Sequence, residues 1–104
     1  MRQKVEHRVR LWIDDIHDPP DANWMIARTS NHAISLLGEI QFDFISFDHD
    51  LGGDDTGYKV AVWLEKEFYC NGVPRPTWEI HSSNPVGAAR ITMAMGGGKW
   101  VLGL

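Results

Sequence analysis

The sequence predicts an α/β domain built on a mostly parallel sheet of four or five strands flanked by helices. Short apolar segments rich in β-forming residues alternate along the chain with amphipathic segments of helical period. The third apolar segment, residues 42–47, is apolar on both faces, which is typical of a strand covered on both sides. With 104 residues, 43% of them hydrophobic, the chain suits a single domain spanning residues 1–104.

The start of the chain departs from a regular alternation of strands and helices. Residues 8–13 (RVRLWI) form an apolar run of β-forming residues that stops against Asp14 and Asp15. Residues 17–23 (HDPPDAN) contain two prolines, and proline lacks an amide hydrogen and keeps the preceding residue out of the helical region. We therefore expect a loop in place of a first helix, followed by a second strand at residues 24–28.

Two helices are expected on either side of the third strand. Thr29 or Ser30 can cap a helix that continues through residues 31–39. Thr56 can cap a second helix over residues 57–69, which keeps apolar residues at helical spacing and ends near an Asn-Gly pair. Both helices can therefore bury one apolar side against the sheet.

The last third of the chain repeats the pattern. Residues 77–80 (TWEI) follow the helix-breaking segment VPRP and predict a fourth strand. Asn84 is placed as an N-cap and Pro85 as the first residue of a third helix, which reaches Met95 and ends at three glycines. Residues 99–104 are compatible with a short last strand or a loose tail.

Composition excludes several classes of function. The formal net charge is −4 and the ten Lys and Arg residues are scattered, so no extended basic surface follows a nucleic-acid backbone. The single cysteine, Cys70, excludes an internal disulfide and a Cys-rich zinc site and suits a reducing compartment. No stretch approaches the roughly 18 apolar residues of a membrane span. We expect a soluble cytoplasmic protein that does not bind a membrane.

Polar residues collect where three of the expected strands end. Parallel strands place their carboxyl ends along one edge of a sheet, where α/β proteins bind ligands. In chain order, these residues are Asp14 and Asp15 after the first strand, Asp48, His49 and Asp50 after the third, and His81, Ser82, Ser83 and Asn84 after the fourth. Three segments of the chain therefore bring carboxylates, imidazoles and hydroxyls to one rim.

Carboxylates gathered at one rim repel one another. At an effective dielectric constant near 20, two like charges about 4 Å apart cost roughly 4 kcal/mol. Protonation of one acid, a cation from the protein, or a bound metal ion would relieve this repulsion. No Lys or Arg lies beside the clusters in sequence, and oxygen ligands without thiolates favour Mg²⁺ or Mn²⁺. We therefore expect a divalent metal ion, and nitrogen from His49 or His81 would tilt the preference toward Mn²⁺ or a zinc-like ion.

Three segments carry a resemblance to a known family: LWIDDIHDPP, FISFDHDLGGDDTGYKVAVWL and EIHSSNPVG. In this order they resemble the cyclic-phosphate-processing receiver-like domains, relatives of the phosphoacceptor receiver domains of bacterial response regulators. The resemblance covers the chain from residue 11 to about residue 91. It implies a receiver-like (flavodoxin-like) fold, with Asp14 and Asp15 as metal ligands, Asp48 at the phosphoacceptor position and Ser82 as the hydroxyl that contacts the phosphoryl group.

Two departures from ordinary receivers bear on function. The Pro-Pro loop stands in place of the first helix, which would leave that side of the site open. The receiver lysine follows the fifth strand, whereas Lys99 precedes the possible fifth strand, and nothing in VLGL replaces it. The chain has instead His49, Asp50 and His81, which suit general acid–base work on a phosphate ester beside a metal ion.

These considerations define the expected site. The predicted metal ligands are Asp14, Asp15, Asp48 and Asp50, the predicted catalytic residues are Asp48, His49, His81 and Ser82, and the expected ion is Mg²⁺ or Mn²⁺. The expected ligand is a phosphate or cyclic phosphate of a nucleotide or RNA end, and the family resemblance implies a conflict- or repair-system setting. The small size of the domain also fits a phage or accessory-locus protein. A metal-dependent phosphoesterase, a signalling receiver phosphorylated on Asp48 and a binding module without chemistry are the three hypotheses.

Some acidic and polar residues have structural roles open to them. Asp54 and Asp55 are expected in the glycine-rich turn and at the start of the next helix, outside the site. Asp50 can shape its loop, Ser82 can bond backbone at its turn, and Asn84 fits a helix cap.

The histidines and tryptophans divide in the same way. His49 and His81 can be structural histidines near the core, although two imidazoles at neighbouring strand ends also fit a site. His17 is one of three further histidines without such a context. The tryptophans indicate packing, and Trp24, next to the open loop, is also placed to stack on a base.

Overall fold

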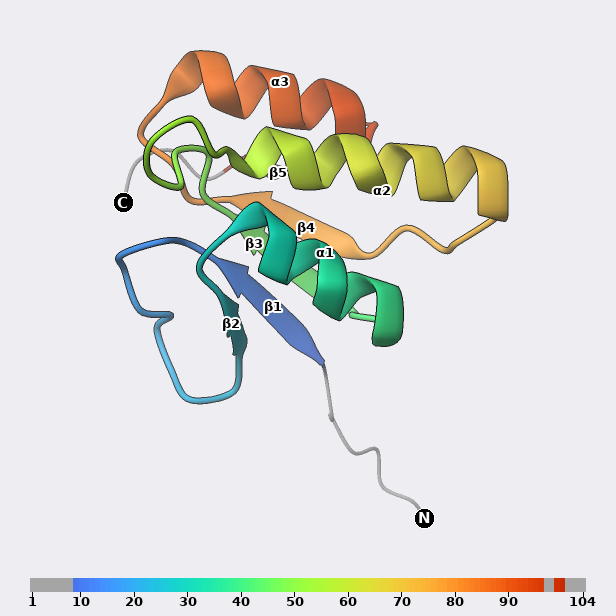
Figure 1. The fold of residues 1–104 in the computed structure, drawn as a ribbon, viewed down its shortest axis with the longest axis horizontal. Helices are drawn as coiled ribbons and strands as arrows, with labels where there is room; N and C mark the ends of the chain where they lie inside the picture. The colour runs from blue at the N-terminus through green and yellow to red at the C-terminus, as the bar shows by residue number, and fades with distance from the viewer. Residues whose placement is uncertain (1–8, 97–98, 101–104) are drawn as a thin grey trace.

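The structure, a computed structural model, describes residues 9–96 and 99–100. Within them the chain forms a parallel sheet of five strands and three helices (Figure 1). The elements, in chain order, are β1 (Arg10–Ile13), β2 (Met25–Ala27), α1 (Ser30–Glu39), β3 (Phe44–Phe47), α2 (Gly57–Asn71), β4 (Thr77–Ile80), α3 (Pro85–Met95) and β5 (Lys99–Trp100). The predicted α/β fold is confirmed. Residue 8 of the expected first strand and residues 101–104 of the last segment lie outside the described residues.

The sheet has the strand order β2-β1-β3-β4-β5, and every pairing is parallel. The register aligns the last residues of β1, β3 and β4 with one another. Two further hydrogen bonds, from the Asp48 amide to the Ile13 carbonyl (2.8 Å) and from the His81 amide to the Phe47 carbonyl (2.8 Å), extend the alignment past the strands. The three polar segments that follow these strands therefore start side by side.

One face of the sheet packs against all three helices. Alternate strand residues, which share a face because side chains in a strand have a period of two, join residues of α1, α2 and α3 in one core cluster. The sheet residues of this cluster are Leu11, Ile13, Ala27, Ile45, Phe47, Trp78 and Ile80. In the described part of the chain, none of the helices combines the length and apolar character that a membrane crossing requires.

The other face of the sheet is covered in part by the segment between β1 and β2. This segment is the loop predicted from its two prolines, and it returns Trp24 over the sheet. The Trp24 ring packs edge to face on Trp12 (5.5 Å between centroids) and on Phe44 (5.7 Å), and the Arg10 guanidinium lies 5.5 Å from its centroid. Aromatic side chains from a loop thus replace the packing that a first helix would give this face.

The helix ends follow the chemistry that their residues predict. At the start of α1, the hydroxyl of Thr29 accepts a hydrogen bond from the backbone amide of the third helical residue. At the start of α3, Oδ1 of Asn84 accepts one from the backbone amide of Gly87 (3.0 Å). At the other ends of α2 and α3, Gly72 (φ 65°) and Gly96 (φ 80°) adopt the left-handed conformation that glycine tolerates.

Asp55 fixes the start of a helix distant from it in sequence. Its carboxylate accepts hydrogen bonds from both the amide (2.8 Å) and the hydroxyl of Ser30, the first residue of α1. Burial favours the neutral acid, but these hydrogen bonds and the charge of Lys59 hold the pKa of Asp55 below its usual value. Asp55 therefore ties the segment after β3 to α1, as well as lying just before α2.

Asp55→Ala is expected to lower the free energy of unfolding by about 1–2 kcal/mol, because it leaves two donors of the buried Ser30 without their partner. Urea unfolding followed by tryptophan fluorescence measures the change. The neighbouring Asp54 is exposed, so Asp54→Ala is the matched control and should change stability by less than about 0.5 kcal/mol. Equal losses in the two variants would contradict the role of Asp55.

Candidate functional site

Three acids meet at the carboxyl edge of the sheet. One carboxylate oxygen from each of Asp14, Asp15 and Asp48 lies within 4.8 Å of the other two. Asp14 is fully buried, whereas Asp15 and Asp48 are partly exposed. The structure thus brings together three of the four predicted metal ligands, and Asp50 is not part of this group. We call Asp14, Asp15 and Asp48 the carboxylate trio.

Asp14 is held in place by hydrogen bonds to both of its oxygens. Oδ1 accepts from the amides of Ile16 (2.9 Å) and His17 (2.8 Å), and Oδ2 lies 2.9 Å from Nε2 of His81. Burial favours the neutral acid, but these partners together keep the pKa of Asp14 below its usual value. Asp14 thus satisfies two backbone amides at the start of the loop that follows β1.

His81 is buried and has a protein partner at each ring nitrogen. Nε2 contacts Asp14, and Nδ1 lies 2.7 Å from the hydroxyl of Ser46, which also donates to Glu79 (2.9 Å). The imidazole stacks on Trp12 with 3.9 Å between centroids and 5° between planes. Burial lowers the pKa of His81, and the carboxylates of Asp14 and Glu79 oppose this effect. Both ring nitrogens of His81 therefore contact protein groups, and the contact at Nε2 helps to fix the orientation of the Asp14 carboxylate.

Within the carboxylate trio, Asp48 is the acid whose ionised form is disfavoured. Burial and the charges of Asp14 and Asp15 raise the pKa of Asp48 to about 6, against the favourable hydrogen bonds from the His49 amide and the Ser82 hydroxyl. Ser82 is buried just after β4, and its hydroxyl also accepts a hydrogen bond from the backbone amide of Asn84 (3.0 Å). Close to neutral pH, a nearby positive charge would therefore favour ionised Asp48.

His49 and Asp50 form a separate pair next to α3. His49 Nδ1 lies 2.9 Å from Asp50 Oδ1, and the side-chain amide of Asn84 donates through Nδ2 to Asp50 Oδ2 (3.3 Å). The His49 ring packs on Gly87 so closely that a Cβ there would lie 2.2 Å from its Cγ. The His49 hydrogen bond, reinforced by Asn84 and opposed by weak burial, lowers the pKa of Asp50. The pair joins the loop after β3 to the first turn of α3.

A cleft of about 320 Å³ opens beside the carboxylate trio. Its lining residues are Asp15, Ile16, His17, Asp48, Asp50, Gly52, His81, Ser82 and Ser83. His49 does not line it, although the sequence predicted a catalytic role for this residue. His17, for which no role was predicted, does line the cleft: its side chain is 72% exposed, and Nδ1 lies 3.4 Å from Asp14 Oδ2.

The position of His17 depends on the loop conformation. The Trp12 indole donates to the His17 carbonyl (2.9 Å), and the Arg28 guanidinium donates to the carbonyls of His17 (2.8 Å) and Asp14 (3.1 Å). These bonds hold the backbone of the loop against the end of β1, so that its side chains border the cleft. The only sequence signal for His17 is its position three residues after Asp14, in a loop next to the acids.

Gly57 places the start of α2 directly against the site. A Cβ at this position would lie 2.1 Å from the backbone oxygen of Asp48, and the Gly57 amide donates to the His49 carbonyl (2.7 Å). Only glycine allows α2 to approach the backbone of Asp48 this closely without a shift.

Gly57→Ala is therefore expected to displace the backbone at Asp48 and to lower the free energy of unfolding by about 2–3 kcal/mol. Gly38→Ala is the matched control, because a Cβ in the last turn of α1 meets nothing within 4 Å. It should stabilise the protein by about 0.5–1 kcal/mol through helix propensity. Urea unfolding of both variants measures the difference, and a similar response in both would contradict the close contact at Gly57.

Asp48→Asn tests the electrostatic strain of the metal-free protein. The pKa of Asp48 rises from 3.8 to about 6 on folding, so the destabilisation from its charge is absent below about pH 4 and grows as pH rises to about 6. At pH 7 in EDTA, Asp48→Asn should raise the free energy of unfolding by on the order of 1–2 kcal/mol. Near pH 4 the gain should vanish. Urea unfolding at both pH values measures this, and a gain independent of pH would contradict it.

The chain is similar to receiver domains in both sequence and structure. Residues 9–96 match the family model described as the cyclic-phosphate processing receiver domain. The signal receiver domain of an HD domain-containing protein from Pseudomonas fluorescens Pf-5 has a TM-score of 0.71 and 15% identity, over 97% of this chain and 79% of that chain.

A second solved structure is that of a response regulator from Burkholderia pseudomallei with a phosphorylated aspartic acid, calcium ion and citrate. It has a TM-score of 0.67 and 19% identity, over 92% of this chain and 59% of that chain. At such identities, these structural matches establish the fold alone. No curated protein sequence matches the chain.

Proposed function

The chain belongs to the cyclic-phosphate processing receiver domain family, and we propose that its cleft binds Mg²⁺ or Mn²⁺ and acts on a phosphate or cyclic phosphate of a nucleotide or RNA end. The observation that carries the proposal is the carboxylate trio within 4.8 Å, next to a cleft of about 320 Å³. Carboxylates this close favour a divalent cation between them. A cation in turn attracts an anionic ligand into the cleft.

The chemistry of the donors fits a hard divalent ion. The trio offers only carboxylate oxygens, the ligand type preferred by Mg²⁺ and Mn²⁺. The raised pKa of Asp48 supports the fit, because an added positive charge would relieve that strain. The calcium ion in the structure of the Burkholderia response regulator also supports a hard divalent ion in a related fold. When bound, such an ion would neutralise phosphate charge and polarise the phosphorus centre.

The cleft itself supports an anionic ligand only when a cation is present. Among the lining residues that the structure describes there is no Lys or Arg, and three of them are aspartates. The volume lies at the lower end of the range for small-molecule sites, which suits a phosphate with part of a nucleoside. In this proposal the Ser82 hydroxyl and the exposed His17 ring, which both line the cleft, donate hydrogen bonds to phosphate oxygens, while His81 holds Asp14 in position.

A signalling receiver phosphorylated on Asp48 is the second candidate. The Ser82 hydroxyl contacts Asp48, and the Burkholderia response regulator carries a phosphorylated aspartic acid. This candidate requires the phosphoryl group to transfer to Asp48, whereas the first requires a phosphate ester to be processed in the cleft.

The metal step is tested by calorimetric titration of the metal-free protein with MnCl₂ or MgCl₂. Asp15→Asn and Asp48→Asn are expected to weaken binding at least about tenfold, because each removes one charged ligand. Asp54→Asn makes the same chemical change in an exposed residue outside the trio and should bind as the wild type does. If the wild type binds neither ion, the proposed function fails.

The chemical step is tested with 2′,3′-cyclic nucleotides, cyclic dinucleotides and RNA ends bearing a 2′,3′-cyclic phosphate, with products separated by chromatography. Turnover that requires Mn²⁺ or Mg²⁺ and is lost in Asp48→Asn would support phosphate processing. Stable phosphorylation by acetyl phosphate, read as a mass increase absent in Asp48→Asn, would support the signalling receiver instead. Tight nucleotide binding without turnover would leave a recognition module.

A further inference from the structure

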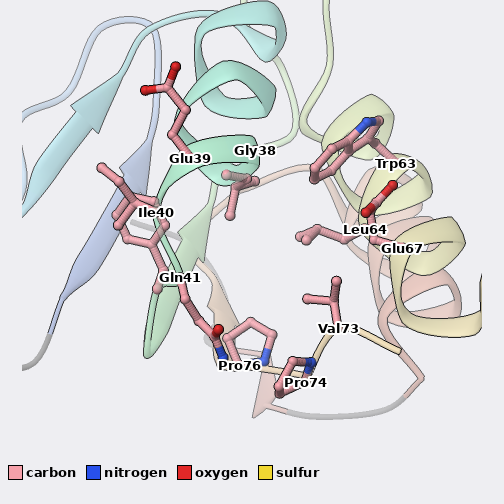
Figure 2. A pocket seen from close by; sticks show the side chains of 12 residues that line it. Gly38, Glu39, Ile40, Gln41, Trp63, Leu64, Glu67, Val73, Pro74 and Pro76 are labelled. Carbon is pink, nitrogen blue, oxygen red and sulfur yellow. The ribbon is translucent and has the colours of Figure 1, made fainter. Parts of the chain in front are cut away.

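A second cavity, of about 430 Å³, lies at the opposite end of the sheet from the carboxylate trio (Figure 2). Its walls come from the end of α1, the C-terminal half of α2, and the connections that lead into the amino ends of β3 and β4. We propose that this cavity binds a short segment of a partner protein in which a bulky apolar side chain is flanked by Lys or Arg. The inference does not depend on the proposed function, because it concerns other residues.

The cavity presents an apolar surface built on the core. Phe42 and Leu64, which line it, are buried and belong to the core cluster, so its base is anchored in the packed interior. In Figure 2, Trp63 and Leu64 extend from α2, and Val73 from the connection after it, toward the opening. A cavity of this size and composition suits one large aliphatic or aromatic side chain with its neighbours.

The rim of the cavity is rigid on one side. Pro74 and Pro76, in the connection between α2 and β4, both line it and fix the backbone torsion φ (Figure 2). The Val73 amide is tied to the Glu67 carbonyl (3.3 Å). A surface that is already ordered loses little conformational entropy when a ligand binds, which favours recognition of a short segment.

The electrostatics of the cavity select a cation. Glu67 lines it from α2 and Glu39 from the end of α1, where the Glu39 carboxylate points away from the opening in Figure 2. Among the described residues that line the cavity there is no Lys or Arg. Both helices end at this cavity, so the partial negative charge of their carbonyl ends adds to the two carboxylates. Neither helix has a basic residue in its last turn to offset that charge. The same charges oppose a phosphate, so this cavity is not a second nucleotide site.

The arginine in the connection after α2 is directed away from the cavity. Arg75 lies between the two prolines, but its guanidinium donates to the Met95 carbonyl (2.8 Å) and stacks over the Phe68 ring (4.6 Å). It therefore joins the connection after α2 to α3 and leaves the acidic rim uncompensated by that side chain. The complementary surface is apolar at its centre and basic at its edges, which defines the expected partner segment.

The experiment titrates acetylated five-residue peptides into the ¹⁵N-labelled full chain, with a central Leu or Phe between Arg residues. Shifts of the backbone amides of residues 37–42, 63–67, 73 and 75 are expected, with dissociation constants of about 0.1–1 mM. The same peptides with Glu in place of Arg should bind at least about tenfold more weakly. The double variant Glu39→Lys/Glu67→Lys should weaken the Arg peptides by a similar factor.

Matched controls separate this result from a structural effect. Glu65→Lys makes the same charge change on α2 at a residue that does not line the cavity, and it should leave the affinity unchanged. If the double Lys variant unfolds, Glu39→Gln/Glu67→Gln replaces it and should weaken binding about threefold. The proposal is overturned if no peptide shifts these amides, if Glu peptides bind as well as Arg peptides, or if Glu65→Lys weakens binding as much as the double variant does.

Discussion

The mutual repulsion of Asp14, Asp15 and Asp48 is the constraint on which the rest of the structure depends. A parallel register aligns the ends of β1 and β3 and so brings the acids within 4.8 Å. Hydrogen bonds to Asp14 stabilise its charge, and the repulsion raises the pKa of Asp48. In the described part of the chain, no Lys or Arg among the residues that line the cleft offsets the negative charge. The loop after Asp14 contributes to this stabilisation, because two of its backbone amides donate hydrogen bonds to the Asp14 carboxylate.

The aromatic packing on the second face of the sheet serves the same site. Trp12 stacks on the His81 ring, and its indole also holds the loop through the His17 carbonyl. Trp24 then packs against both Trp12 and Phe44. The orientation of the His81 ring is therefore fixed by stacking as well as by hydrogen bonds, and the ring in turn fixes the Asp14 carboxylate. The loop that replaces a helix both opens the cleft and supplies the packing that keeps its acids in place.

Local signals made most of the fold predictable, whereas long-range pairings between side chains were not. Helix caps, prolines and the spacing of apolar residues act over a few residues and can be read locally. Because the carboxyl ends of parallel strands meet at one edge of a sheet, Asp14 and Asp48 were expected at the same edge. The bond from Asp55 to Ser30 spans 25 residues, so no local pattern contains it. Likewise, the two partners of His81 come from β3 and the end of β1, and only the folded register brings them to its ring.

The two ends of the sheet are connected by β3 and α2. β3 is hydrogen-bonded to a neighbour on each side, so it resists displacement along its axis. α2 touches the Asp48 backbone at Gly57 with no room for a Cβ, and about two to three turns later it lines the second cavity with Trp63 and Glu67. A ligand in that cavity can therefore alter the geometry of the carboxylate trio only by moving α2. If α2 stays rigid, the free energies of binding at the cavity and at the trio are independent.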